Sequence, residues 1–220
     1  MITNRDIEIF KFINRYGKSY IEVIGKTFFE NEQVARNRIN SLYKQGFISY
    51  WKTNLMTPRR AIILTEEIKK YLYEEFDVKP KNAKLNVSTI EHNMIEQLAD
   101  FYLSKLENST VERTTVFTHS KKLNHIPDLI YHHEKGKVYI EVETSKKSSK
   151  RYISIFENMR KDNVLQVIYI VKNENLLNNY SASFPKWNKL KFITIDNLIN
   201  NIKTKNKIEP ISQDDIARPI

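Results

Sequence analysis

Cysteine is absent from this chain of 220 residues, and glycine occurs only four times. Without cysteine the chain can form neither a disulfide framework nor a thiolate zinc site, which fits a reducing compartment. With so few glycines it has no glycine-rich phosphate-binding loop, which argues against a nucleotide-driven motor. Any nitrogen ligand for a metal would have to come from the five histidines.

Long hydrophobic runs are also missing. No segment approaches the roughly 18 consecutive apolar residues that a membrane span needs. The opening residues 1–6 are polar and lack the apolar core of a signal peptide. We therefore expect a cytoplasmic protein without a membrane partner.

The charge of the chain is strongly positive, with a formal net charge of +10. Lysine and arginine release counterions from phosphates, so this balance favours a polyanionic partner such as nucleic acid. A basic enzyme with no such partner is the alternative. The abundance of lysine, asparagine and isoleucine is typical of an AT-rich genome, which raises the lysine count independently of binding.

The first eighty residues contain three helical patterns followed by a hairpin pattern. Apolar residues recur at helical spacing in residues 4–17, 20–28 and 31–45. Residues 47–51 and 61–64 then read as two strands, joined by a basic tip that contains Arg59 and Arg60. This order resembles the winged helix-turn-helix family, in which the third helix usually enters the major groove of DNA.

The resemblance implies a set of DNA contacts. The polar residues on one face of the predicted third helix are Gln33, Arg36, Asn37, Asn40 and Lys44. Arginine and asparagine can make bidentate contacts with base edges, while Arg59 and Arg60 suit phosphates or a minor groove. Winged helices also serve as dimerisation or protein-docking modules, which is the alternative. One such module reads only a short half-site, so high specificity would require a homodimer or a partner such as a replication or transfer protein.

The chain divides by composition. The polar stretch of residues 77–84 contains Pro80 and separates the two patterned regions. We expect a winged-helix domain in residues 1–80, a linker in 81–87, a second domain in 88–208 and a tail in 209–220. The tail contains two prolines and is either flexible or a docking arm for a partner.

The second domain is predicted to be α/β, with a mixed sheet. Helical patterns occupy residues 89–106, 148–160 and 196–202, with a weaker one before the last strand. Strand patterns occupy residues 111–117, 126–131, 138–143, 164–171 and 192–195. The predicted order is therefore αβββαβαβα.

Three acidic residues converge in this prediction. Side chains alternate along a strand, so Glu141 and Glu143 share a face with Tyr139, and Asp128 lies on the partner strand. Such a cluster repels itself unless a cation fills it. Mg²⁺, or Mn²⁺, prefers hard oxygen ligands and could polarise a phosphodiester and lower the pKa of a bound water. The pattern predicts metal-assisted phosphodiester cleavage, although an Asp and a Glu-x-Glu also occur by chance as surface ion-pair partners.

Pro127-Asp128 and Glu141-Val142-Glu143 resemble the motif of the PD-(D/E)xK nuclease superfamily, with Glu143 where that family usually has Lys. The resemblance implies a restriction-endonuclease-like αβββαβ core. It makes Asp128 and Glu141 metal ligands, and Glu143 the residue that orients or deprotonates water. Lys146 or Lys150 would supply the missing positive charge, and Glu96 would be an auxiliary metal ligand. Lys147 and Arg151, on or beside the basic helix, would contact the DNA backbone, unless this helix face is merely solvated.

Over most of the chain, the winged helix, the sequence Glu91-His92-Asn93 and the two acidic motifs resemble the replication-relaxation family of mobile elements. The resemblance implies a DNA-binding protein of a plasmid or mobile element that acts as a Mg²⁺-dependent endonuclease or nickase. Its ligand would be double-stranded DNA, with single-stranded DNA as a further candidate. The alternative is a catalytically inactive origin-binding replication or transfer factor, or a transcriptional regulator. Convergence of the Asp128, Glu141 and Glu143 carboxylates would favour the enzyme. Salt bridges from these acids to Lys146 or Lys150 would favour the binding protein.

Overall fold

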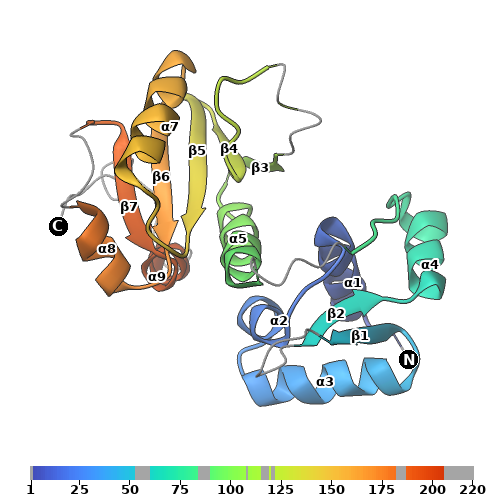
Figure 1. Cartoon of the computed structure of the whole chain (residues 1–220). Helices are drawn as coiled ribbons and strands as arrows, with labels where there is room; N and C mark the ends of the chain where they lie inside the picture. Colours follow the sequence, from blue (N-terminus) through green and yellow to red (C-terminus); the bar gives the residue numbers. More distant parts are fainter. Residues whose placement is uncertain are drawn as a thin grey trace. The chain divides into compact units, whose positions relative to one another are not determined.

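The computed structural model describes residues 2–52, 60–83, 90–107, 109–114, 119, 122–181 and 187–205. The fold is of the α+β class and contains a five-stranded mixed sheet. The chain forms two compact units, Met1–Gln97 and Leu98–Ile220, which we call the first and the second unit (Figure 1). Helix α5 (Ile90–Leu103) begins in the first unit and ends in the second.

The first unit is built from short helices and one hairpin. In chain order its elements are α1 (Asn4–Tyr16), α2 (Ile21–Phe28), α3 (Glu32–Lys44), β1 (Ile48–Lys52), β2 (Arg60–Leu64) and α4 (Glu66–Phe76). Thr3 and Asp6 form a capping box at the start of α1, and the side chain of Asn31 caps α3. Helices α1, α2 and α3 confirm the three predicted helices. Strands β1 and β2 pair antiparallel, which confirms the predicted hairpin.

Helix α4 was not predicted. Its apolar residues Ile68 and Leu72 are four residues apart, which is the helical spacing, and both are buried. The negatively charged Glu66 and Glu67 lie in its first turn, where they complement the helix dipole. The signal was therefore present, directly after the second strand of the hairpin.

The core of the first unit joins every one of these helices to the hairpin. Its buried side chains are Ile9, Phe10, Ile13, Ile24, Ile39, Leu42, Ile48, Ile62, Leu64, Ile68 and Leu72. Burial of each such side chain stabilises the fold by roughly 1.5–3 kcal/mol. The backbone of Ser19 pairs with that of Ile62, with N–H···O distances of 2.9 and 2.8 Å. This bridge ties the α1–α2 connection to β2.

The chain after α4 returns along α1. The side-chain amide of Asn14 donates to the carbonyl of Lys79 at 2.9 Å and accepts from the N–H of Lys81 at 3.0 Å. The carbonyl oxygen of Asn82 lies 2.7 Å from the position that a Cβ of Gly17 would take, and Gly17 has a φ of +74°. Glycine is therefore required at residue 17. Of the segment expected as a linker, residues 81–83 are described, and residues 84–87 lie outside the described part.

The second unit is organised around the five-stranded sheet. Its elements are β3 (Thr110–Arg113), β4 (Leu129–His133), β5 (Gly136–Glu143), α7 (Ser149–Lys161), β6 (Gln166–Val171), α8 (Glu174–Ser181), β7 (Leu190–Thr194) and α9 (Ile195–Lys205). With α5 in front, the described elements follow the predicted order αβββαβαβα. The tail expected in residues 209–220 lies outside the described residues.

The sheet has the order β3-β4-β5-β6-β7. Strands β3, β4 and β5 pair antiparallel, whereas β5, β6 and β7 pair parallel. Parallel neighbours need a crossover, and α7 and α8 supply the two crossovers. The predicted mixed sheet is thus confirmed.

One face of this sheet carries a core of aromatic and aliphatic side chains. Tyr139 of β5 and Tyr169 of β6 pack there against Tyr152 and Phe156 of α7, which crosses this face (Figure 1). Glu141 is the register partner of Tyr169, so the alternation of side chains places it among these rings.

Within the described ranges, no helix is long and apolar enough to cross a membrane.

Candidate functional site

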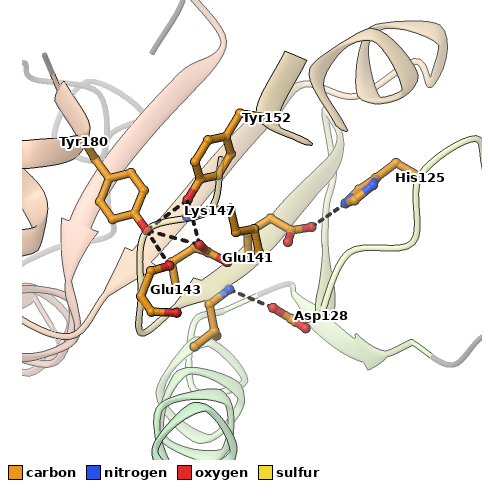
Figure 2. A network of polar contacts seen from close by, with 9 residues as sticks. His125, Asp128, Glu141, Glu143, Lys147, Tyr152 and Tyr180 are labelled. Atoms are coloured by element: carbon orange, nitrogen blue, oxygen red, sulfur yellow. Dashed lines mark hydrogen bonds and ion pairs between the residues drawn. The ribbon is translucent and has the colours of Figure 1, made fainter. Parts of the chain in front are cut away.

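Two of the predicted acidic residues are brought together by strand register. Leu129 of β4 pairs with Ile140 of β5, so Asp128, the residue before β4, lies across from Glu141. Directly opposed residues of antiparallel strands point to the same face. One carboxylate oxygen of Asp128 accepts the backbone N–H of Val142 at 2.7 Å, which anchors Asp128 against β5 (Figure 2). A hydrogen bond from the N–H of Thr114 to the carbonyl of Asp128, at 3.3 Å, holds the backbone from the other side.

Glu141 is buried, with only 6% of its surface exposed. Its Oε1 lies 2.7 Å from Nε2 of His125. Burial raises the pKa of Glu141, and the neighbouring Asp128 carboxylate adds to this, whereas the hydrogen bond from His125 and the charge of Lys147 oppose it. The pKa of Glu141 remains above its ordinary value, so this carboxylate would be stabilised by a further cation.

Glu143 lies two residues further along the same face and is engaged by three side chains. Its Oε1 forms an ion pair with the ammonium of Lys147. The hydroxyls of Tyr152 and Tyr180 lie 2.9 and 3.1 Å from its Oε2 and 2.9 Å from each other. The hydroxyl of Tyr180 also lies 2.8 Å from the carbonyl of Ser145 (Figure 2). Glu143 therefore ties the end of β5 to α7, to α8 and to the segment between β5 and α7.

Lys147 is the cation that the structure places beside the acids. Burial lowers the pKa of Lys147, and the charge of Arg151 adds to this, whereas Glu141 and Asp128 counteract it. Its backbone N–H donates to the hydroxyl of Tyr152 at 2.9 Å. The sequence pattern instead predicts Lys147 at the DNA backbone, and Lys146 or Lys150 as the positive charge at the acids. The side chains of Lys146 and Lys150 are exposed, and so is that of Arg151.

His125 was not predicted as a site residue. It lies in the segment before β4, three residues before Asp128, and only 16% of its side chain is exposed. Tyr152 and Tyr180 were also missed, since they come from helices that follow the motif by many residues. A signal was available for His125, because histidine is rare in this chain and this one closely precedes Pro127-Asp128.

The donor set suits a hard divalent cation held by two protein carboxylates. Mg²⁺ is commonly bound through one or two carboxylates, with waters and substrate phosphates as its other ligands. A carboxylate has about four lone-pair sites, and the hydrogen bonds from Val142 to Asp128 and from His125 to Glu141 each occupy one of them. In the described part of the chain, no three His, Asp or Glu side chains are grouped closely enough to hold a metal ion by themselves. Glu96, the expected auxiliary ligand, is buried on α5 within the first unit.

The first unit presents the polar face of α3 to solvent. The predicted contact residues on this helix are all exposed: Gln33, Arg36, Asn37, Asn40 and Lys44. Two contacts restrain them within the helix, since Gln33 donates to Asn37 at 3.1 Å and Arg36 pairs with Glu32 at 2.5 Å. Arg38 instead turns toward α1 and forms an ion pair with Asp6, which is fully buried.

The hairpin adds an aromatic and cationic edge to this face. The ring of Tyr50 lies 4.9 Å from that of Tyr43, and its hydroxyl donates to the side chain of Asn40 at 3.2 Å. The guanidinium of Arg60 lies 5.6 Å from the centre of the Tyr50 ring. Arg60 thus stands beside the polar face of α3, and Arg59 lies outside the described residues.

Comparison with known proteins assigns the chain to no family. A scan against protein-family models finds no match, and a search of curated proteins finds no significantly similar sequence.

Proposed function

We propose that this chain is a DNA-binding protein of a plasmid or mobile element whose second unit is a divalent-metal-dependent endonuclease or nickase. The observation that carries the proposal is the opposition of Asp128 and Glu141 on adjacent strands, with Lys147 beside them. Two carboxylates and one ammonium group at the end of a buried strand are unusual for a purely structural sheet, because their desolvation is costly. Perturbed ionisable groups of this kind are typical of active sites.

Asp128 and Glu141 would hold Mg²⁺ or Mn²⁺. When bound, such an ion supplies Lewis acidity toward a phosphodiester. Lys147 would supply positive charge toward the scissile phosphate. Glu143, with an ion pair to Lys147 and two tyrosine hydroxyls on its other oxygen, would orient Lys147 rather than deprotonate water. The exposed Lys150 and Arg151, in the first turn of α7, suit contacts with the DNA backbone.

The first unit would select the DNA as a winged helix. Three helices followed by an antiparallel hairpin support this proposal, as does the exposed polar face of α3. Asn40 and Arg36 have the geometry for base edges, and Arg60 the charge for phosphates. The proposed ligand is double-stranded DNA, and the proposed location is the cytoplasm. A second copy of the chain, or a replication or transfer protein as partner, would extend the short half-site that one winged helix reads.

A second candidate function has one observation in its favour. Both buried glutamates already have a partner, since Glu141 binds His125 and Glu143 binds Lys147. Acids that are neutralised within the protein have less need of a metal ion. The protein would then be an inactive origin-binding factor or a regulator on a nuclease-like scaffold.

The experiment that separates the two is nicking of a supercoiled plasmid that carries the protein's own genomic neighbourhood, with Mg²⁺ or Mn²⁺. We expect nicking by the native protein, with Asp128→Asn and Glu141→Gln each lowering the rate by at least 100-fold, about 2.7 kcal/mol of activation free energy. Glu134→Gln, an exposed acid in the β4–β5 turn, is the matched control and should leave the rate unchanged. Tight DNA binding by all four proteins without nicking would establish the binding factor instead.

A further inference from the structure

His125 is held at the candidate site by its main chain as well as by its ring. Its backbone N–H donates to Oδ2 of Asp162 at 3.1 Å. The neighbouring Asn124 donates its backbone N–H and its side-chain amide to Oδ1 of Asp162, at 3.0 and 2.7 Å. The segment before Pro127 is therefore fastened to the end of α7, where Asp162 is the C-terminal cap residue.

Asp162 also contacts the sheet. The hydroxyl of Tyr139 donates to its Oδ2 at 3.0 Å. Tyr139 lies on β5 two residues before Glu141 and therefore points to the same face. One carboxylate thus fixes the histidine segment relative to the strand that carries Glu141. Four hydrogen bonds to a single carboxylate are sufficient to define its orientation.

The imidazole of His125 completes the connection. Its Nε2 lies 2.7 Å from Oε1 of Glu141 (Figure 2). With a carboxylate as partner, Nε2 carries the proton and donates it to the hydrogen bond. Glutamate has three rotatable side-chain bonds, so a donor fixed in place removes much of its conformational freedom.

We infer that His125, fastened by Asp162, is a positioning residue that orients the Glu141 carboxylate for a divalent cation. The inference rests on the proposed function, because it assumes that Asp128 and Glu141 bind this ion. Partners that hydrogen-bond a ligating carboxylate commonly change metal affinity by about 10–100-fold when they are removed. Because Oε1 receives the bond from His125, Oε2 would be the oxygen offered to the ion.

Helix α7 connects both buried glutamates to the rest of the unit. Tyr152, in its first turn, contacts Glu143, and Asp162, at its end, supports His125 and through it Glu141. A single rigid element thus carries the supports of both acids. The spacing between Glu141 and Glu143 is fixed by the strand. Helix α7 contributes to the orientation of both side chains, and Lys147 and Tyr180 contribute to that of Glu143.

The test is Mn²⁺ binding to the full chain, measured from the loss of the free-ion electron paramagnetic resonance signal, without DNA. His125→Phe keeps a ring but removes the donor and is expected to weaken Mn²⁺ binding about 10-fold. His125→Gln places an amide N–H at about the reach of Nε2 and is expected to restore binding to within about threefold of the native value. Asp162→Asn should lie between them, since it leaves the histidine in place but disturbs its fastening. Circular dichroism melting of each variant separates a local effect from unfolding.

Two different failures can be told apart. If the native protein binds no Mn²⁺, or Asp128→Asn binds it equally well, the proposed metal site is wrong. If Asp128→Asn abolishes binding but both His125 variants bind as the native protein does, the metal site stands and the role of His125 is wrong. Should His125→Phe not fold, an affinity of Asp162→Asn equal to that of the native protein would overturn the inference in the same way.

Discussion

The polar residues of the two units are held in opposite ways. On the solvent-facing side of α3 in the first unit, the five predicted contact residues are exposed, and the contacts described for them are to the same helix or to the hairpin. At the acids of the second unit the polar residues are buried and contact residues from distant segments, such as Glu143 with Tyr180. Exposed polar groups remain available to a large ligand at little cost in stability. Buried ones have fixed positions, which is what chemistry on a small group of atoms requires.

The two units can be monitored separately. The chain has two tryptophans, Trp51 in the first unit and Trp187 in the second. A Trp51→Phe background therefore reports on the second unit by fluorescence, and a Trp187→Phe background on the first.

The largest effect on stability is expected when the buried ion pair of the second unit is removed. Lys147→Met leaves Glu143 without its cation and should lower the free energy of unfolding by roughly 3 kcal/mol, the lower end for a buried pair because the lysine is partly exposed. Lys146→Met, at the exposed neighbouring position, should change it by less than about 0.5 kcal/mol. Urea titration of both variants in the Trp51→Phe background measures this difference. Equal effects would mean that burial of the pair does not matter.

An intermediate effect is expected where the first unit has a buried charge of its own. Burial alone would raise the pKa of Asp6, but hydrogen bonds from Arg38 and Thr3 outweigh it and hold that pKa below its ordinary value. A lowered folded-state pKa contributes stability that is present above the unfolded value and is lost as the pH falls through the folded value. The first unit should therefore lose stability below about pH 4.

Asp6→Asn should remove this part of the pH dependence and cost about 2 kcal/mol at pH 7. The measurement is urea unfolding at pH 7, 5, 4 and 3 in the Trp187→Phe background. Asp77→Asn, which changes an exposed aspartate at the end of α4, is the control. A variant whose stability falls with acid as steeply as that of the native protein would contradict the assignment.

The smallest effect on stability is expected on α3. Arg36→Ala and Lys44→Ala remove exposed cations and should each change the free energy of unfolding by less than about 0.5 kcal/mol. If α3 contacts DNA, both should nevertheless weaken binding. Lys44→Ala should reduce the slope of log K against log salt concentration by about 1, and Arg36→Ala should relax the preference for one DNA sequence. Fluorescence anisotropy with a duplex at several salt concentrations measures this. The matched control is Lys70→Ala on the exposed side of α4, which should leave the slope unchanged.

Much of the fold could be predicted because it follows local patterns. The apolar spacing in α1, α2 and α3 located the helices, and alternation in β4 and β5 located the strands on either side of their turn. Helix α4 was overlooked although Ile68 and Leu72 marked it. At the candidate site, the register that opposes Asp128 and Glu141 followed from a short turn between two strands.

The partners of the acids could not be predicted in the same way. Lys147 rather than Lys146 contacts Glu143. This could not be predicted, because the irregular segment after β5 has no periodicity that fixes where its side chains point. Tyr180 reaches Glu143 from a helix 37 residues away, and His125 reaches Glu141 from a segment without regular structure. Such contacts depend on how loops are fastened, and the hydrogen bonds of Asp162 that fasten one of them join residues that are 37 and 38 positions apart in the sequence.

The positions of the helices and strands follow from the periodicity of the sequence. The net positive charge follows from its composition, and the side of β5 on which Glu141 and Glu143 lie follows from their spacing. The residues that these two acids contact depend on tertiary packing. Glu141 is bound by an imidazole, and Glu143 by an ammonium group and two hydroxyls. The physical reason is that periodicity acts over a few residues of one element. The surroundings of a buried charge are instead set by whichever donors distant segments bring to it when the chain packs.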